Sequence, residues 1–261
     1  MESVVSAVGA GKTRRIRRFV GRDGRAVLVA IDMQLATGSG PAPSVVEAVA
    51  EGRPDGMLVT WQIARRYPEA FAECGLILRM DGAVTHLDRN GTGDGLSLMY
   101  RAEQAAMIGA DAVILMVYPG MSEERLSLRR LAALVGECER IGMPVLAESI
   151  PGGWNQEVPW DTENIARSAR ICVEIGADAV KTMAPTQIDE FGEVVKGCEA
   201  PLFVLGGPKR DSEDEVVGYA AGVVAAGASG ICFGRNVWGA SDPRAMVRRL
   251  GRAVHGTGER A

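Results

Sequence analysis

Short, fully apolar segments alternate with amphipathic segments along nearly the whole chain. The apolar segments are continuously hydrophobic, which is typical of parallel strands whose two sheet faces are both covered. Eight strands are predicted on this basis: Ala26–Asp32, Gly56–Thr60, Gly75–Met80, Ala112–Tyr118, Pro144–Ile150, Ala179–Thr182, Leu202–Gly207 and Gly230–Asn236.

Helices are predicted between these strands. Four of them start with a capping residue, in three cases followed by acidic first-turn residues, and they cover Ser122–Ile141, Asp161–Ile175, Ser212–Ala226 and Asp242–Val254. Gly142, Gly176 and Gly227 follow the first three helices, where glycine can adopt the left-handed conformation that ends a helix.

The number of strand–helix units decides the fold class. Eight units in about 230 residues fit a closed (β/α)8 barrel better than an open, doubly wound sheet. A Gly-Ala-Asp or Gly-Ala-Ser joint also recurs before the fourth, sixth and eighth strands. We therefore predict an α/β protein with a single TIM-type barrel domain over residues 1–261, including a capping segment with a short helix at 1–24 and a disordered tail at 255–261.

Charge and composition exclude several classes of protein. A net charge of −4 argues against a general nucleic-acid binder, and no apolar run reaches the length of a membrane span. The start of the chain lacks the apolar core of a signal peptide, so a cytoplasmic location is predicted. The five cysteines and two histidines show no metal-ligand spacing, which predicts reduced, structural thiols and no metal site.

Two features near the start of the chain suggest nucleotide or nucleic-acid binding. Gly9–Thr13 resembles part of a P-loop, but Ser6 stands where the motif needs its first glycine. The basic run from Lys12 to Arg18 is interrupted by Ile16 and followed by Phe19. An amphipathic helix that caps the bottom of the barrel is favoured there over a nucleic-acid arm or a transit peptide.

Lys181 stands in an apolar run that is predicted to be a buried strand. Burying a lysine is costly unless its charge is removed or used. A desolvated lysine loses basicity and becomes a nucleophilic amine, as Schiff-base chemistry on a carbonyl requires. The sequence therefore predicts that Lys181 is either a reactive amine or half of a buried ion pair.

Chemistry in such barrels lies at the carboxyl ends of the strands. Asp32, Tyr118 and Glu148 stand at or near the ends of the first, fourth and fifth predicted strands. The loops after the last two strands contain small and basic residues whose backbone and side chains could hold a phosphate: Gly206, Gly207, Lys209, Gly234 and Arg235. The alternative is that these are tight-turn glycines and solvated basic side chains.

Several of these segments together resemble the archaeal-type class I fructose-bisphosphate aldolase family, which includes the aminodideoxyheptulosonate synthases. The similarity covers nearly the whole chain, and it is carried by Gly176–Thr182, Leu205–Lys209, Gly227–Trp238, Val117–Gly120 and Arg14–Phe19 followed by Asp23–Arg25. The resemblance implies that Lys181 forms a Schiff base with a ketone donor such as dihydroxyacetone phosphate. It also implies that Asp32 assists proton transfers around the imine.

The chain departs from the family pattern in two places. The family shows Asp-His-Gly at the end of the first strand, whereas this chain has Asp32-Met33-Gln34. The family also has an acid/base tyrosine after the fifth strand, where this chain has Ile150. Glu148 lies on the same side as Ile150 by strand alternation, so either Glu148 or Tyr118 could take over proton transfer. Otherwise Glu148 orients Lys181 or a substrate hydroxyl, and Tyr118 is a pocket wall.

The predicted function is that of a class I aldolase, a lyase that makes or breaks a C–C bond in a phosphorylated ketose or sugar. A biosynthetic role with an aldehyde acceptor is favoured, and Schiff-base chemistry of this kind needs no metal or organic cofactor. The alternatives are a transaldolase-like or acyl-transfer enzyme on the same lysine, and an inactive barrel that binds phosphosugars. The resemblance further implies a homo-oligomer, built on rings of subunits.

Overall fold

The computed structural model describes residues 9–32, 38, 41–82, 85, 87 and 96–256. Its eight parallel strands close into a barrel in the order β1-β10-β9-β8-β7-β6-β3-β2, which confirms the predicted fold class. The strands are β1 (Ala26–Ile31), β2 (Gly56–Val59), β3 (Gly75–Arg79), β6 (Ala112–Val117), β7 (Val145–Ser149), β8 (Ala179–Thr182), β9 (Leu202–Leu205) and β10 (Gly230–Phe233).

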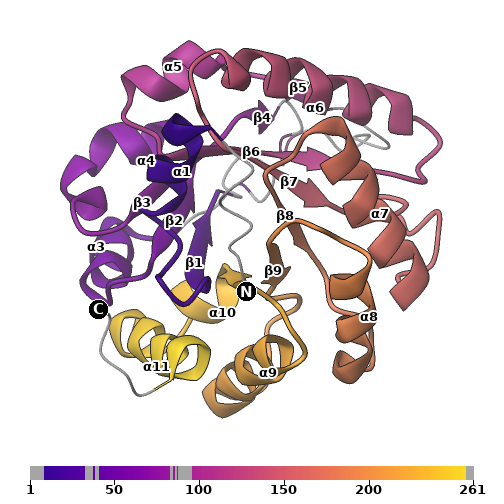
Figure 1. The fold of residues 1–261 in the computed structure, drawn as a ribbon. Coiled ribbons are helices and arrows are strands. Elements are labelled where there is room, and N and C mark those ends of the chain that lie inside the picture. Colours follow the sequence, from indigo (N-terminus) through magenta and orange to yellow (C-terminus); the bar gives the residue numbers. More distant parts are fainter. Residues whose placement is uncertain are drawn as a thin grey trace.

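Helices surround the ring of strands (Figure 1). Those that connect successive barrel strands are α3 (Pro43–Glu51), α4 (Trp61–Arg66), η2 (Pro68–Phe71), α5 (Ala102–Met107), α6 (Glu124–Glu139), α7 (Thr162–Ile175), η3 (Ile188–Glu190), α8 (Phe191–Lys196) and α9 (Glu213–Ala225), and the short helix α10 (Arg235–Trp238) follows the last strand. In the described part of the chain, α1 (Ala10–Ile16) is the first helix and α11 (Pro243–His255) is the last. None of the helices in the described part of the chain combines the length and apolarity needed to cross a membrane.

Helix capping follows the sequence in three of the four predicted cases. Asp161, Ser212 and Asp242 each accept a hydrogen bond from a backbone N–H in the first turn of α7, α9 and α11. The prediction that Ser122 caps α6 is wrong. The hydroxyl of Ser122 instead donates to Glu157, and α6 begins after Glu123 without a side-chain cap.

The eighth strand is shorter than predicted. β10 ends at Phe233, and Arg235 and Asn236 begin the short helix α10. The buried side-chain amide of Asn236 donates to the carbonyl oxygens of Gly206 and Pro208, and its oxygen accepts from the backbone N–H of Arg210. These bonds join the loops after β9 and β10, which an extended strand through Asn236 would not allow.

Two apolar cores follow from the pleat of the strands, because alternate side chains face opposite sides. One fills the barrel and includes Leu28, Ile77, Ile114 and Phe203. The larger core lies between the barrel and the helices. All five cysteines are buried and unbridged.

The amino ends of the strands are covered by the start of the chain. Phe19 packs into the core inside the barrel, and a Cβ on Gly75 would lie 2.6 Å from the Cβ of Phe19, so glycine is required there. Lys12 on α1 pairs with Glu139 and, at 3.0 Å, with Asp178 just before β8. The basic run thus contacts the barrel itself. Residues 1–8 and 257–261 of the predicted capping segment and tail lie outside the described residues.

The sequence placed His255 at the start of a disordered tail, but it is the last residue of α11. Its Nδ1 lies 2.8 Å from an oxygen of Asp23, and its Nε2 lies 2.9 Å from an oxygen of Asp55. That Asp55 oxygen also accepts from the backbone N–H of Val27 in β1. Hydrogen bonding to Asp55, against the effect of burial, raises the pKa of His255.

Replacing His255 with alanine is expected to destabilise the protein more at about pH 6 than at about pH 9. A group whose pKa is raised on folding stabilises the protein below its unfolded pKa and loses that effect as the pH rises through the folded pKa. We expect a loss on the order of 1 kcal/mol at the lower pH. Urea unfolding of both proteins at the two pH values measures it. Arg252→Ala, which removes an exposed side chain from the same helix, is the control, and an equal loss at both pH values would contradict the prediction.

Candidate active site

Four charged side chains continue the inner face of the barrel toward the carboxyl ends of its strands. Asp32, Arg79, Glu148 and Lys181 each stand two residues beyond a residue of the inner core, namely Ala30, Ile77, Leu146 and Ala179. Strand alternation therefore turns all four into the barrel. Each has at most 8% of its surface exposed, so the group is charged and almost completely removed from water.

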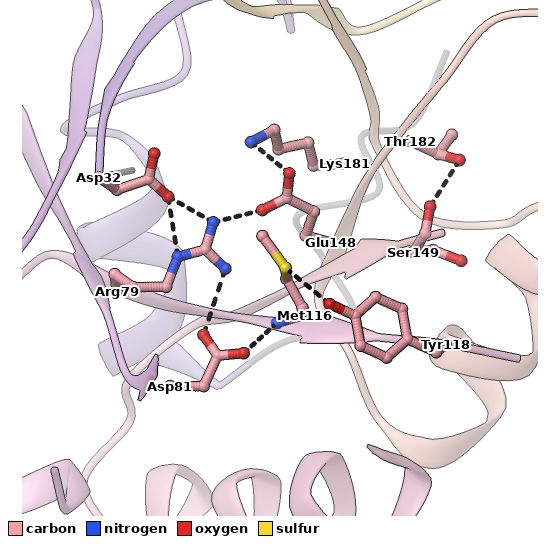
Figure 2. A network of polar contacts seen from close by, with 9 residues as sticks. All are labelled: Asp32, Arg79, Asp81, Met116, Tyr118, Glu148, Ser149, Lys181 and Thr182. Atoms are coloured by element: carbon pink, nitrogen blue, oxygen red, sulfur yellow. Dashed lines mark hydrogen bonds and ion pairs between the residues drawn. The ribbon is translucent and has the colours of Figure 1, made fainter. Parts of the chain in front are cut away.

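Lys181 and Glu148 form the centre of this group. They are direct neighbours in the register of β8 and β7, and Lys181 Nζ lies 2.6 Å from Glu148 Oε1. Figure 2 shows the lysine amine pointing at this carboxylate. In the part of the chain that the structure describes, Glu148 is the one ion-pair partner of Lys181.

Arg79 joins the two catalytic carboxylates that were expected from the sequence. Its guanidinium lies between Asp32 and Glu148 in Figure 2. Nη2 contacts both Asp32 Oδ2 and Glu148 Oε2, and Nε donates to Asp32 Oδ2 at 2.8 Å. Asp32 is therefore paired with Arg79, and the ion pair that Lys181 forms is with Glu148.

Asp81 holds the arginine from the other side. Its Oδ1 accepts from Arg79 Nη1 at 3.3 Å, and its Oδ2 accepts from the backbone N–H of Met116 at 2.8 Å. Asp81 belongs to β4 (Asp81–Gly82), which pairs with β5 (Ser97–Leu98) in a small antiparallel sheet that was not predicted. The arginine is thus fixed to the backbone of β6 through Asp81.

The sequence reasoning missed Arg79 and Asp81. The sequence does contain a sign of Arg79, because this arginine is a charged residue in an apolar strand, as Lys181 is. A charged side chain on the inner face at the carboxyl end of a barrel strand is a candidate for the site wherever it occurs. Applying that test to every strand would have found Arg79.

The expected loss of basicity at Lys181 is wrong. Burial has the largest single effect and opposes the ammonium charge, but Glu148, Cys232 and Asp32 together outweigh it and raise the pKa of Lys181 to about 12. Conversely, burial is outweighed at Glu148 by Lys181 and Arg79, which lower its pKa to about 2. The resting site therefore holds an ammonium–carboxylate pair, and Lys181 must lose a proton before it can act as a nucleophile.

Tyr118 and Ile150 lie on the outer side of this network. The Tyr118 hydroxyl donates to Met116 Sδ at 3.1 Å, and the ring packs in the core between barrel and helices. Ile150 follows the end of β7 and is fully buried in that same outer core. The expectation that Glu148 and Ile150 share a side fails because β7 ends at Ser149 and regular alternation ends with it.

The five predicted phosphate residues are divided between two environments. Lys209 and Arg235 are exposed and line a pocket of about 230 Å³ between the loops after β9 and β10. Its charged lining also includes Arg210 and the carboxylates of Asp211 and Glu213. The glycines have different roles: Gly207 has a φ of +65°, and its Cα faces open space. Gly206 and Gly234 pack against Phe233 and Ala30. Neither Lys181 nor Glu148 lines this pocket.

Asn236 is a third residue that the sequence reasoning missed, since it was assigned to a strand. Its side chain ties the two loops together and so fixes the distance between Lys209 and Arg235. Among the described residues, no group of three or more His, Cys, Asp or Glu side chains is arranged to hold a metal ion. The site combines a buried lysine, a carboxylate in contact with it and, at the same end of the barrel, a pocket whose lining has three basic and two acidic side chains.

Comparison with known proteins places these features in context. A family model described as "DeoC/LacD family aldolase" matches residues 26–240. The 2-amino-4,5-dihydroxy-6-oxo-7-(phosphonooxy)heptanoate synthase of Streptomyces griseus is 32% identical over 74% of this chain and 69% of its own length. The class 1 fructose-bisphosphate aldolase of Thermoproteus tenax is 29% identical over 95% of this chain and 96% of its own.

A solved structure adds chemical detail to these similarities. An archaeal fructose-1,6-bisphosphate aldolase, with its catalytic lysine covalently bound to the carbinolamine intermediate of the substrate, has a TM-score of 0.81 with this chain. The two are 29% identical, and the match covers 94% of this chain and 100% of the other.

Proposed function

This chain belongs to the DeoC/LacD family of aldolases, and from that premise we propose that it joins a phosphorylated ketone donor to an aldehyde through Lys181, or reverses that reaction. It is a class I aldolase, a lyase that works through a lysine Schiff base, as the sequence resemblance predicted. The observation that carries the assignment of Lys181 is its contact with Glu148 inside the carboxyl end of the barrel, at 2.6 Å.

The proposed cycle begins with the Lys181–Glu148 pair. The Nζ proton moves to Glu148, and the free amine attacks the carbonyl carbon of the donor. The carbonyl oxygen leaves as water, which gives a protonated imine. This imine withdraws electrons, so the adjacent carbon loses a proton and an enamine forms.

The enamine carbon then bonds to the carbonyl carbon of the aldehyde. The alkoxide that results takes up a proton, and water hydrolyses the imine to release the product and Lys181. Glu148 is proposed to carry these protons, with Asp32 at the other side of Arg79 stabilising the positive charge. Tyr118 is a weaker candidate, because its hydroxyl donates to Met116 Sδ.

The phosphate of the donor is proposed to bind at Gly206, Gly207, Lys209, Gly234 and Arg235. Two basic side chains on the wall of one pocket, and the open left-handed backbone at Gly207, support this assignment. Held there, the phosphate would fix the carbonyl near the amine and convert a bimolecular attack into an intramolecular one. The Streptomyces griseus relative, a synthase of a phosphorylated heptanoate, supports a biosynthetic role with a phosphorylated product. The family resemblance also supports a cytoplasmic homo-oligomer.

Reduction with borohydride in the presence of dihydroxyacetone phosphate tests the proposal. The imine should be reduced to a stable secondary amine, and peptide mass mapping should find it on Lys181. The chain has only four lysines, so Lys12, Lys196 and Lys209 serve as internal controls. Absence of an adduct, or an adduct on one of those three, would overturn the proposal. Turnover of the donor without an aldehyde would instead indicate acyl transfer.

A further inference from the structure

Arg79 occupies the point where the charges of the site meet. Two cations, Arg79 and Lys181, share three carboxylates, those of Asp32, Asp81 and Glu148. All five side chains are buried. Buried charges are stable only when each is paired and hydrogen-bonded, so the distribution of partners among them is constrained.

Arg79 forms hydrogen bonds to all three of these carboxylates. Nε and Nη2 both bind the same oxygen of Asp32, Nη1 binds Asp81, and Nη2 also reaches Glu148 Oε2. Lys181 is left with Oε1 of Glu148. Without Arg79, the carboxylates of Asp32 and Glu148 would both act on the Lys181 ammonium group and hold its proton more firmly.

We propose that Arg79 is a positioning residue of the aldolase reaction. Its guanidinium binds Asp32 and the second oxygen of Glu148, so that Lys181 has one proton acceptor, Glu148 Oε1, and can give up its proton to become the free amine. This inference rests on the proposed function of Lys181. It gives Arg79 no contact with substrate, because its donors are directed to the three carboxylates.

The shape of the guanidinium explains why arginine stands at this position. A planar fork with five N–H donors can bridge carboxylates in several directions at once, whereas a lysine ammonium is a compact point charge on a flexible stem. Asp81 completes the arrangement, since its second oxygen is bound to the backbone of β6. The direction of the fork is therefore set by the barrel.

The electrostatic consequences agree with this geometry. Burial raises the pKa of Glu148, but Lys181 and then Arg79 lower it, and Arg79 also acts against the rise at Lys181. Removing the guanidinium charge of Arg79 should therefore raise the pKa of Glu148 and the pKa of Lys181. The acid limb of imine formation should shift to higher pH, because Glu148 would be protonated earlier and accept no proton from Lys181.

Two variants test the proposal through the rate of imine formation, measured by borohydride quenching with dihydroxyacetone phosphate. The measurements run from about pH 3 to about pH 9, so that they reach down toward the pKa of Glu148, which is about 2. Arg79→Gln keeps hydrogen-bond donors but removes the charge, and it should move the acid limb upward by at least about one pH unit. Arg79→Lys keeps the charge but loses the fork. It should leave the limb in place and lower kcat about tenfold, with KM for the donor within about threefold of the wild type.

Each rate is divided by the fraction of molecules that can be trapped, so that misfolded protein does not contribute. An unshifted acid limb in Arg79→Gln would overturn the proposal. If Arg79→Gln does not fold, Arg79→Lys is the deciding variant. A purely structural role of Arg79 would reduce only the number of trappable sites. A wild-type kcat per trappable site in Arg79→Lys would therefore overturn the proposal. If the wild type forms an adduct and the variants behave like it, only the role of Arg79 fails. If the wild type forms no adduct, the proposed function fails and the role of Arg79 with it.

Discussion

Lys181→Arg should abolish turnover, with kcat/KM lowered on the order of 10⁵-fold or more. Arginine keeps a positive charge beside Glu148, so the buried carboxylate is not left without a partner. Its guanidinium cannot lose a proton under working conditions and forms no imine with a ketone. The substitution therefore removes the nucleophile while it preserves the charge of the site.

The matched control for this variant is Lys196→Arg. Lys196 lies on α8 with most of its side chain exposed, and it pairs with Glu193 on the surface. It should retain wild-type kcat/KM and wild-type trapping. Thermal unfolding should show that both variants are folded. Trapping in Lys181→Arg, or activity above about one part in a hundred of wild type, would show that another group forms the covalent intermediate.

The barrel could be predicted because its information is local. Each strand is a continuous apolar run, and glycines and capping residues mark the ends of helices, so the eight units were found without knowledge of the rest of the structure. Strand ends were less predictable. Arg235 and Asn236 were assigned to a strand, but they turn into α10 because Asn236 bonds to a loop 26 to 30 residues away in the chain.

The candidate site was predictable in its parts and unpredictable in its partnerships. Lys181 was named from its place in an apolar run, and Asp32 and Glu148 were named from strand ends. The pleat of the strands brings all three to the inner face of the barrel. The pKa of Lys181 could not be predicted, because its direction depends on which carboxylate stands beside it across the β7–β8 register. Arg79, at the end of β3, forms ion pairs with Asp32 and Glu148. No local sequence pattern predicts ion pairs between residues of different strands.

Glu148→Gln should separate the proton transfers that follow imine formation from imine formation itself. We expect kcat to fall about 10²- to 10⁴-fold, the usual contribution of a positioned general acid or base. Borohydride should still trap the donor on Lys181. The Glu148 carboxylate is the strongest influence that raises the pKa of Lys181 against burial, so its removal lowers that pKa and leaves more free amine at neutral pH.

Glu174→Gln is the control, because Glu174 is an exposed residue of α7 that pairs with Arg170 on the helix surface. Its kcat should equal that of the wild type. The two roles left open for Glu148 predict different results. If Glu148 only orients Lys181, the glutamine side chain, which can still accept a hydrogen bond from Nζ, should restore most of the activity. If Glu148 carries protons, trapping persists while turnover fails, since an amide cannot take up the proton that must leave the carbon beside the imine.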